Sequence, residues 1–171
     1  MKKDKSIFIF LAILVAINLI QCCFTGLLND EAYYWVYSKY LAWGYFDHPP
    51  MIALFIAIGD KFFHHEIGVR LLSILSSAAT VYVLFLIINP TNKKLFYTVL
   101  ISATPLLAVN FFAVLDIPLL FFTACFYLVY KKYLEDNLLS ISVLLGLCMA
   151  LMLYSKYHGV LVILFVLISN L

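Results

Sequence analysis

The sequence NDEAYYW at residues 29–35, followed by GYFDHPP at residues 44–50, comes directly after the first long hydrophobic run of the chain. It places two adjacent carboxylates, Asp30 and Glu31, at the edge of a membrane, followed by interfacial aromatic residues and a stiff Pro-Pro turn. Ionised carboxylates near hydrocarbon cost several kcal/mol unless they are paired or used. The stretch therefore indicates a site, and the rest of the sequence indicates which side of the membrane it faces.

The composition is typical of an integral membrane protein. Of the 171 residues, 65% are hydrophobic and only 12% are charged, whereas soluble domains carry about 25% charged residues. The net charge of +2 is too small to indicate nucleic acid as a partner. The four cysteines lie in or beside apolar runs without zinc or redox spacing, so we expect them to be buried hydrophobic side chains.

The hydrophobic runs predict an all-α, polytopic transmembrane helical bundle of about six spans. Residues 6–24, 67–88 and 138–154 each form one span. Residues 95–130 contain a single charge, Asp116, and one helix of that length would be ~54 Å long. We therefore expect two spans with a break at Asp116-Ile117-Pro118, where Asp can cap a new helix and Pro suits its first turn.

Two further runs are too short to cross the membrane. The run from Met51 to Phe63 is predicted to form an interfacial or re-entrant helix. The run from Val160 to Leu171 stops without a polar anchor, which predicts an incomplete sixth span and a chain that is part of a larger protein or an incomplete gene product.

The distribution of charge predicts the sidedness. Alternating spans place seven lysines on one side, which the positive-inside rule assigns to the cytoplasm together with the N-terminus. The acidic pair, Asp47-His48, Asp116 and the Lys156/His158 segment all fall on the other side, each at or just beyond the end of a span. Helices packed in one bundle would gather them into one extracytoplasmic pocket. The seven lysines are Lys2, Lys3, Lys5, Lys93, Lys94, Lys131 and Lys132.

Residues 31–43 are predicted to form one amphipathic helix on the outer membrane surface. Asn29 is a good N-cap, the two carboxylates suit the positive end of the helix dipole, and Gly44 is a good stop. Aromatic residues between them fall near one helical face, and Trp and Tyr prefer the headgroup level. The alternative is that Asp30 and Glu31 merely cap this helix.

Four stretches together resemble a known family. They are NDEAYYWVYSKYLAWGYFDHPPMIALFIAIGDKFF (29–63), IGVRLLSIL (67–75), LDIPLLFF (115–122) and YSKYHGVL (154–161). In order and spacing, from about Ile7 to Leu171, the chain resembles the N-terminal part of the protein-mannosyltransferase-like membrane glycosyltransferases of the GT-C superfamily. That group includes protein O-mannosyltransferases, the lipid A aminoarabinose transferase and bacterial envelope transferases. The resemblance implies one domain part over residues 1–171, with residues 29–66 as its first extracytoplasmic loop, which carries interfacial helices.

The resemblance also implies an activity. Such enzymes transfer a sugar from a polyprenyl-phosphate carrier to a lipid, glycan or protein acceptor outside the cytoplasm, which implies an enzyme of the plasma (inner) membrane in contact with membrane lipids. Asp30 takes the family's catalytic acidic position, and Glu31 is its neighbour in an orienting or acceptor-binding role. A carboxylate can act as the base for an attacking hydroxyl, while the leaving phosphate needs cationic or N–H partners.

The remaining candidate residues have two interpretations each. Asp116 lies where the family often has an acidic residue, or it simply caps the fourth span. Lys156 with His158 holds the carrier phosphate, or both are interfacial anchors. Asp47 and His48 touch substrate, or His48 orders the turn before Pro-Pro. Two structural expectations complete the set: Arg70 pairs with Glu66 or Asp60, and His64 and His65 lie in a solvated loop.

Two other classes of function stay open at this level. A transporter or flippase of a lipid-linked substrate would also carry intramembrane acids, although it should have midplane polar groups and an inverted repeat, and the sequence has neither. An inactive truncated membrane fragment is the second alternative. A divalent metal beside the acids is compatible with the sequence, but no ligand set demands one.

Overall fold

The computed structural model describes residues 5–103, 110–136 and 138–169, and within these residues the secondary structure is entirely helical. This confirms the all-α prediction. In chain order the helices are α1 (Lys5–Phe24), α2 (Asn29–Lys39), α3 (Met51–Asp60), α4 (Glu66–Ile88), α5 (Lys93–Ser102), α7 (Asp116–Glu135), α8 (Leu139–Ser155) and α9 (Gly159–Ile168).

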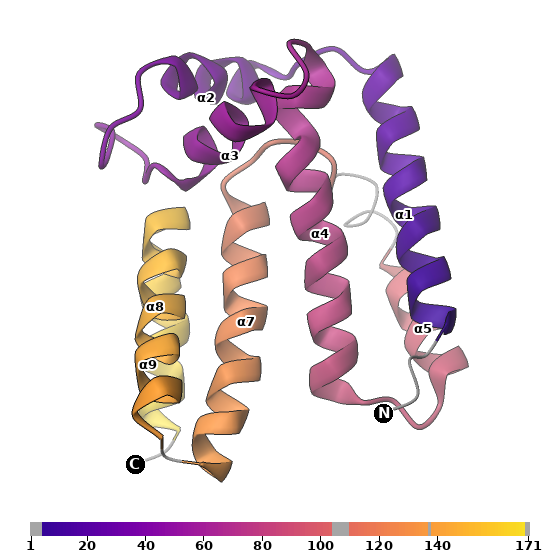
Figure 1. The fold of residues 1–171 in the computed structure, drawn as a ribbon, viewed down its shortest axis with the longest axis vertical. Coiled ribbons are helices and arrows are strands. Elements are labelled where there is room, and N and C mark those ends of the chain that lie inside the picture. The colour runs from indigo at the N-terminus through magenta and orange to yellow at the C-terminus, as the bar shows by residue number, and fades with distance from the viewer. Residues whose placement is uncertain (1–4, 104–109, 137, 170–171) are drawn as a thin grey trace.

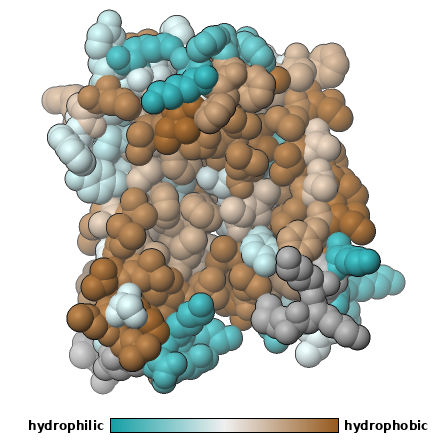
Figure 2. Space-filling model, viewed as in Figure 1, coloured by the Kyte–Doolittle hydropathy of each residue, from teal (hydrophilic) through white to brown (hydrophobic). Residues whose placement is uncertain are grey.

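The helices form a polytopic membrane bundle. Helices α1, α4 and α7 are long and apolar enough to cross a bilayer, and α8 and α9 are shorter apolar helices. Figure 2 shows hydrophobic residues over the middle of one face, with hydrophilic residues gathered at its two ends. Helix α7 begins at the predicted break, Asp116, with Pro118 in its first turn. The span predicted before that break is not found in the described residues, because α5 ends at Ser102 after ten residues.

Helices α1 and α8 run toward one end of the bundle, and α4 and α7 run away from it, which sorts the connections between two ends (Figure 1). Helices α2 and α3, the start of α7 and the turn between α8 and α9 lie at one end, called here the α2–α3 end. The turns after α4 and α7 lie at the opposite end. The polar residues that the sequence assigned to one side are therefore carried by segments at one end.

Helix α2 is shorter than the helix predicted over residues 31–43, and the prediction is wrong at both boundaries. The N-cap position is Leu28 rather than Asn29, and the helix ends at Lys39. The Tyr45 ring stacks on the Tyr37 ring at 3.9 Å, and its hydroxyl donates to the carbonyl oxygens of Tyr37 and Tyr40. These side-chain donors satisfy carbonyls at the helix end, so the chain turns away before Trp43.

Helix α3 lies beneath α2 and against α4, with most of its length buried. Its ten residues span about 15 Å, too short to cross a bilayer. Residues from four segments form the core at this end: Tyr34, Ile52, Ile56, Val69, Ala113 and Leu115. This core fixes α2 and the segment before α7 on the end of α4.

The turn between α3 and α4 depends on two glycines in close contact. A Cβ atom on Gly59 would lie 2.1 Å from the Gly68 carbonyl oxygen, and one on Gly68 would lie 1.8 Å from the Phe63 carbonyl oxygen. Both distances are far inside van der Waals contact, and backbone atoms cannot rotate away as a side chain can.

We expect Gly59→Ala and Gly68→Ala each to destabilise the protein by about 1–3 kcal/mol, because the added methyl separates α3 from α4. Thermal unfolding in detergent measures the change. Gly146→Ala is the matched control, since Gly146 is also helical but has no atom within 4 Å of its Cβ position. Equal stability of all three variants would contradict the close packing.

The two ends of the bundle can be assigned to membrane sides by labelling. Position 47 lies at the α2–α3 end and position 92 in the turn after α4. In a background without the four native cysteines, we expect a reagent confined to the cell exterior to modify a cysteine at 47 and not one at 92. The opposite result would reverse the orientation that the lysines predict.

Candidate active site

A buried ion pair joins α2 to α4. The Arg70 guanidinium donates from Nε to Glu31 Oε1 at 2.8 Å and from Nη2 to Glu31 Oε2 at 2.6 Å. Both side chains are fully buried. The expectation that Arg70 pairs with Glu66 or Asp60 is wrong, because Arg70 points into the bundle, whereas Glu66 is exposed and Asp60 binds Lys39 at 2.6 Å.

Backbone groups complete the hydrogen bonding of this pair. Arg70 also donates to the carbonyl oxygens of Thr25 and Gly26, at 2.7 and 2.8 Å. Glu31 accepts from the backbone N–H groups of Leu28 and Ala113, at 2.9 and 2.8 Å. The pair thereby ties together the end of α1, the start of α2, α4 and the segment before α7, and both Glu31 oxygens are occupied.

Removing one partner leaves the other charge buried without compensation. We expect Arg70→Met to destabilise the protein by roughly 3–5 kcal/mol, measured as thermal unfolding in detergent. Glu66→Gln, which removes an exposed charge one turn earlier in α4, is the control and should have little effect. Similar unfolding temperatures for the two variants would show that the pair does not hold the segments together.

The charges of three carboxylates act on Tyr34 at the α2–α3 end: Asp30 in the first turn of α2, Asp47 in the following loop and Asp116 at the start of α7. Tyr34 is buried, and its burial, followed by the charges of these three carboxylates, raises its pKa to about 12. Three residues far apart in sequence are thus neighbours of one phenol. We call Asp30, Asp47 and Asp116 the acidic cluster.

Asp47 is held by two tyrosines of α2. The hydroxyls of Tyr33 and Tyr37 each donate to its carboxylate at 3.0 Å and also contact each other. Partial desolvation acts to raise the pKa of Asp47, but the hydrogen bonds from Tyr37 and Tyr33 outweigh it and lower the pKa. The His48 ring lies edge-on to Tyr34, with its Nε2 atom 3.4 Å from the Asp47 carboxylate. Asp47 is therefore an ionised group in a fixed position.

Asp116 and Lys156 form an ion pair between α7 and the end of α8. The Lys156 Nζ atom lies 2.7 Å from Asp116 Oδ1, and both side chains are accessible to solvent. Asp116 does not have the capping role that one of its two interpretations gave it. Leu115 is the N-cap residue of α7, and Asp116 binds Lys156 instead. His158 follows as the exposed N-cap residue of α9.

The sequence predicted the acidic residues, Lys156 and both histidines as one group, but it missed the two tyrosines that hold Asp47. Tyr33 and Tyr37 are four residues apart, so they lie on one face of α2; that spacing was the available signal. Among the residues described, no three His, Cys, Asp or Glu side chains come together as a metal site. His64 and His65 are both exposed, and His65 caps α4 by accepting from the Ile67 N–H.

The arrangement offers two kinds of chemistry in one place. Asp30 is exposed in the first turn of α2, so its carboxylate is accessible to accept a proton. Lys156 supplies a cation close to the acidic cluster, where an anionic group can bind. An exposed carboxylate and a lysine–carboxylate pair at one end of a membrane bundle are groups that can serve group transfer from a lipid phosphate.

Comparison with known families identifies the class of protein. A family model described as dolichyl-phosphate-mannose-protein mannosyltransferase matches residues 47–171, which is 125 of the 171 residues. The chain belongs to this family and is a membrane glycosyltransferase of the GT-C type. Neither a curated protein nor a solved structure matches it. The match begins at Asp47, so Asp30 and Glu31 precede it.

Proposed function

We propose that this glycosyltransferase moves a sugar from a polyprenyl-phosphate-linked donor to a lipid, glycan or protein acceptor, with Asp30 as the base. The observation that supports this most directly is the convergence of the acidic cluster and Lys156 at the α2–α3 end. These residues come from four segments, namely the first turn of α2, the loop before α3, the start of α7 and the end of α8. A donor whose phosphate lies at the membrane surface would meet them there.

Asp30 and Glu31 take different roles in this proposal. Asp30 is exposed in the first turn of α2, where it can remove the proton of an acceptor hydroxyl as that oxygen attacks the anomeric carbon. Glu31 has both oxygens bound to Arg70 and backbone N–H groups. We therefore assign Glu31 the orienting role, in which it holds the first turn of α2 and thus the position of Asp30.

The basic residues are proposed to serve the leaving group. As the bond from the anomeric carbon to the phosphate oxygen breaks, negative charge grows on the carrier phosphate. Lys156 can turn from Asp116 toward that phosphate, and His158 follows it by two residues at the start of α9. Asp47 and His48 are proposed to contact the sugar hydroxyls, because Tyr33 and Tyr37 fix that carboxylate beside the cluster.

The site is proposed to face the extracytoplasmic side of the plasma (inner) membrane. The lysine distribution supports this orientation, with a cytoplasmic N-terminus. In this arrangement residues 1–171 form the N-terminal part of the transferase domain, and residues 29–66 form its first extracytoplasmic loop. That loop then carries Asp30 and Asp47 of the acidic cluster at the membrane surface, and the start of α7 carries Asp116.

We expect Asp30→Asn to abolish sugar transfer while leaving expression, membrane insertion and thermal unfolding unchanged, because the amide cannot accept the proton and no fold contact is lost. Transfer of radiolabelled sugar from a polyprenyl-phosphate donor in membranes measures it. Asp60→Asn makes the same chemical change at the carboxylate bound to Lys39 and should retain transfer. Full activity of Asp30→Asn would show that Asp30 is not the base. An equal loss of activity in Asp30→Asn and Asp60→Asn would indicate a general effect of charge.

A further inference from the structure

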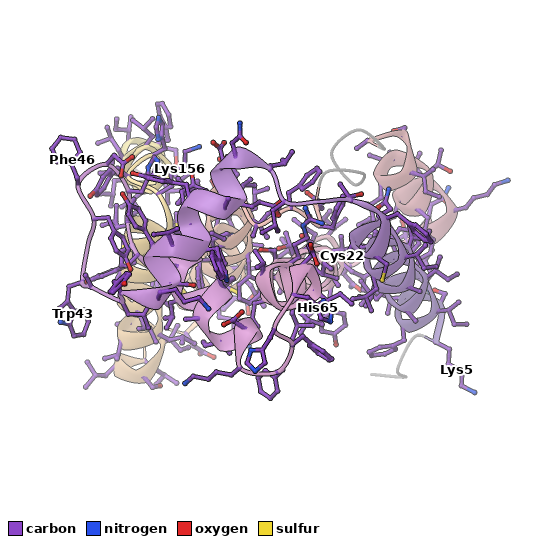
Figure 3. The ribbon with its side chains drawn as sticks, turned by 90° about the horizontal axis from the view of Figure 1, so that it is seen from above. Lys5, Cys22, Trp43, Phe46, His65 and Lys156 are labelled. Carbon is purple, nitrogen blue, oxygen red and sulfur yellow. The ribbon has the colours of Figure 1, made fainter. Side chains whose placement is uncertain are left out.

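The loop after α2 presents large apolar side chains to its surroundings. Trp43 is 89% exposed and Phe46 is fully exposed, and Tyr40 and Leu41 are also exposed. Figure 3 places Trp43 and Phe46 at the edge of the molecule farthest from Lys5. We call residues 40–46 the aromatic loop.

The base of this loop is firmly held. Tyr45 stacks on Tyr37 with nearly parallel rings, and its backbone N–H donates to the His48 carbonyl oxygen at 3.1 Å. Asp47 is bound by Tyr33 and Tyr37. The exposed side chains of the loop therefore project from a backbone that is held in place. An exposed apolar surface of this kind fits an apolar partner.

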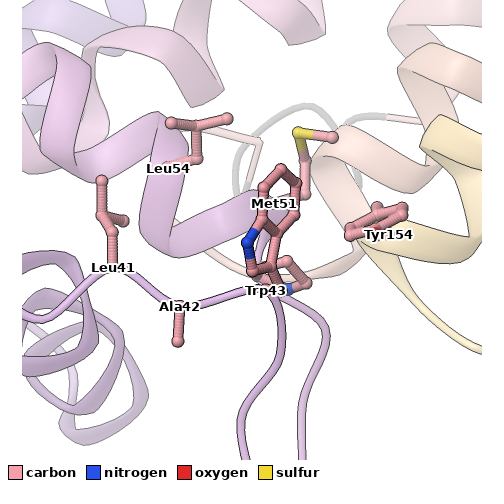
Figure 4. Close-up of a pocket in the computed structure, with 7 residues that line it drawn as sticks. Leu41, Ala42, Trp43, Met51, Leu54 and Tyr154 are labelled. Carbon is pink, nitrogen blue, oxygen red and sulfur yellow. The ribbon is translucent and has the colours of Figure 1, made fainter.

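An apolar groove lies beneath the loop. It has a volume of about 400 Å³ and is formed by residues 41–43, Pro50, Met51, Leu54 and Tyr154 (Figure 4). Its lining is mainly hydrocarbon and aromatic carbon. The groove thus joins the aromatic loop to α3 and to the last turn of α8.

The groove is continuous with the apolar outside of the bundle. Leu153 and Tyr154 at the end of α8 are exposed, as are Val160 and Leu161 at the start of α9. In a protein of a membrane family these outer helix faces are the surface that meets lipid. Tyr154 belongs both to this exposed surface and to the groove, so the groove adjoins the apolar surface of α8 at the end of the bundle where headgroups and acyl chains meet.

From this continuity we propose that the aromatic loop is inserted in the lipid bilayer, with Trp43 and Phe46 at the boundary between headgroups and acyl chains and a phospholipid acyl chain in the groove. Tyr37 stacks on Tyr45 of the loop and also binds Asp47. The loop therefore sets the depth of the acidic cluster relative to the lipid phosphates. This inference rests on the membrane location of the family and does not depend on which residue is the catalytic base.

The two tryptophans of the chain allow a direct test. Trp35→Phe leaves Trp43 as the reporter, and Trp43→Phe leaves Trp35 as the matched control. Trp35 lies under the Lys39 ammonium and beside Asp60, in a hollow that also includes His64 and Glu66. Both full-length variants are placed in phosphatidylcholine nanodiscs, with bromine on the acyl chains either near the headgroup or near the bilayer centre.

We expect Trp43 to lose most of its emission with bromine near the headgroup, to lose less with deep bromine, and to resist aqueous iodide. Trp35 should show the reverse, with quenching mainly by iodide. Phe46→Trp in a background without the native tryptophans supplies a second reporter in the loop, expected to behave like Trp43. Circular dichroism confirms that each variant is helical.

Three results would overturn the proposal. Quenching of Trp43 by iodide and not by bromolipid would place the loop in water. Protection from both quenchers would mean that protein covers the loop. Full relief of bromolipid quenching by a small mole fraction of polyprenyl phosphate would assign the groove to a carrier lipid instead of bulk phospholipid. Loss of sugar transfer in Asp30→Asn has no bearing on these readings, so the two proposals fail separately.

Discussion

The buried pair of Glu31 and Arg70 is the interaction on which the candidate site depends. An unpaired charge inside a membrane bundle is expensive, so the chain can hold Arg70 there only if every donor is matched. The carboxylate of Glu31 and the carbonyls of Thr25 and Gly26 provide those partners. As a consequence the first turn of α2 has one position relative to α4.

That position explains why two adjacent acids differ so strongly. Consecutive residues on a helix point about 100° apart, so fixing Glu31 toward Arg70 turns Asp30 outward. Glu31 is fully buried and Asp30 is exposed. The same turn directs Tyr34 inward, next to His48, with the three carboxylates of the acidic cluster around it. One buried contact therefore orients the α2 residues of the site, Asp30 and Tyr34.

The directions of the helices bring the remaining residues of the site together, because α4 and α7 begin, and α1 and α8 end, at the same end of the bundle (Figure 1). Each polar segment that begins or ends a long helix at the α2–α3 end is brought near the others by the packing of α3, α4, α7 and α8. Asp116 and Lys156, 40 residues apart in sequence, meet as an ion pair in this way. The aromatic loop and its groove lie at the same end, so polar and apolar binding surfaces are adjacent.

The sequence by itself determined the helical class, the membrane location, the break at Asp116 and the set of polar residues at one end. Hydrophobic run length and charge position are local properties, and they are sufficient for those conclusions. Only the tertiary structure decided that Arg70 pairs with Glu31, that α2 ends at Lys39, and that Tyr33 and Tyr37 hold Asp47. The reason is physical: which charge meets Arg70 depends on how α4 is rotated against α1 and α2, and side-chain packing across helices sets that rotation.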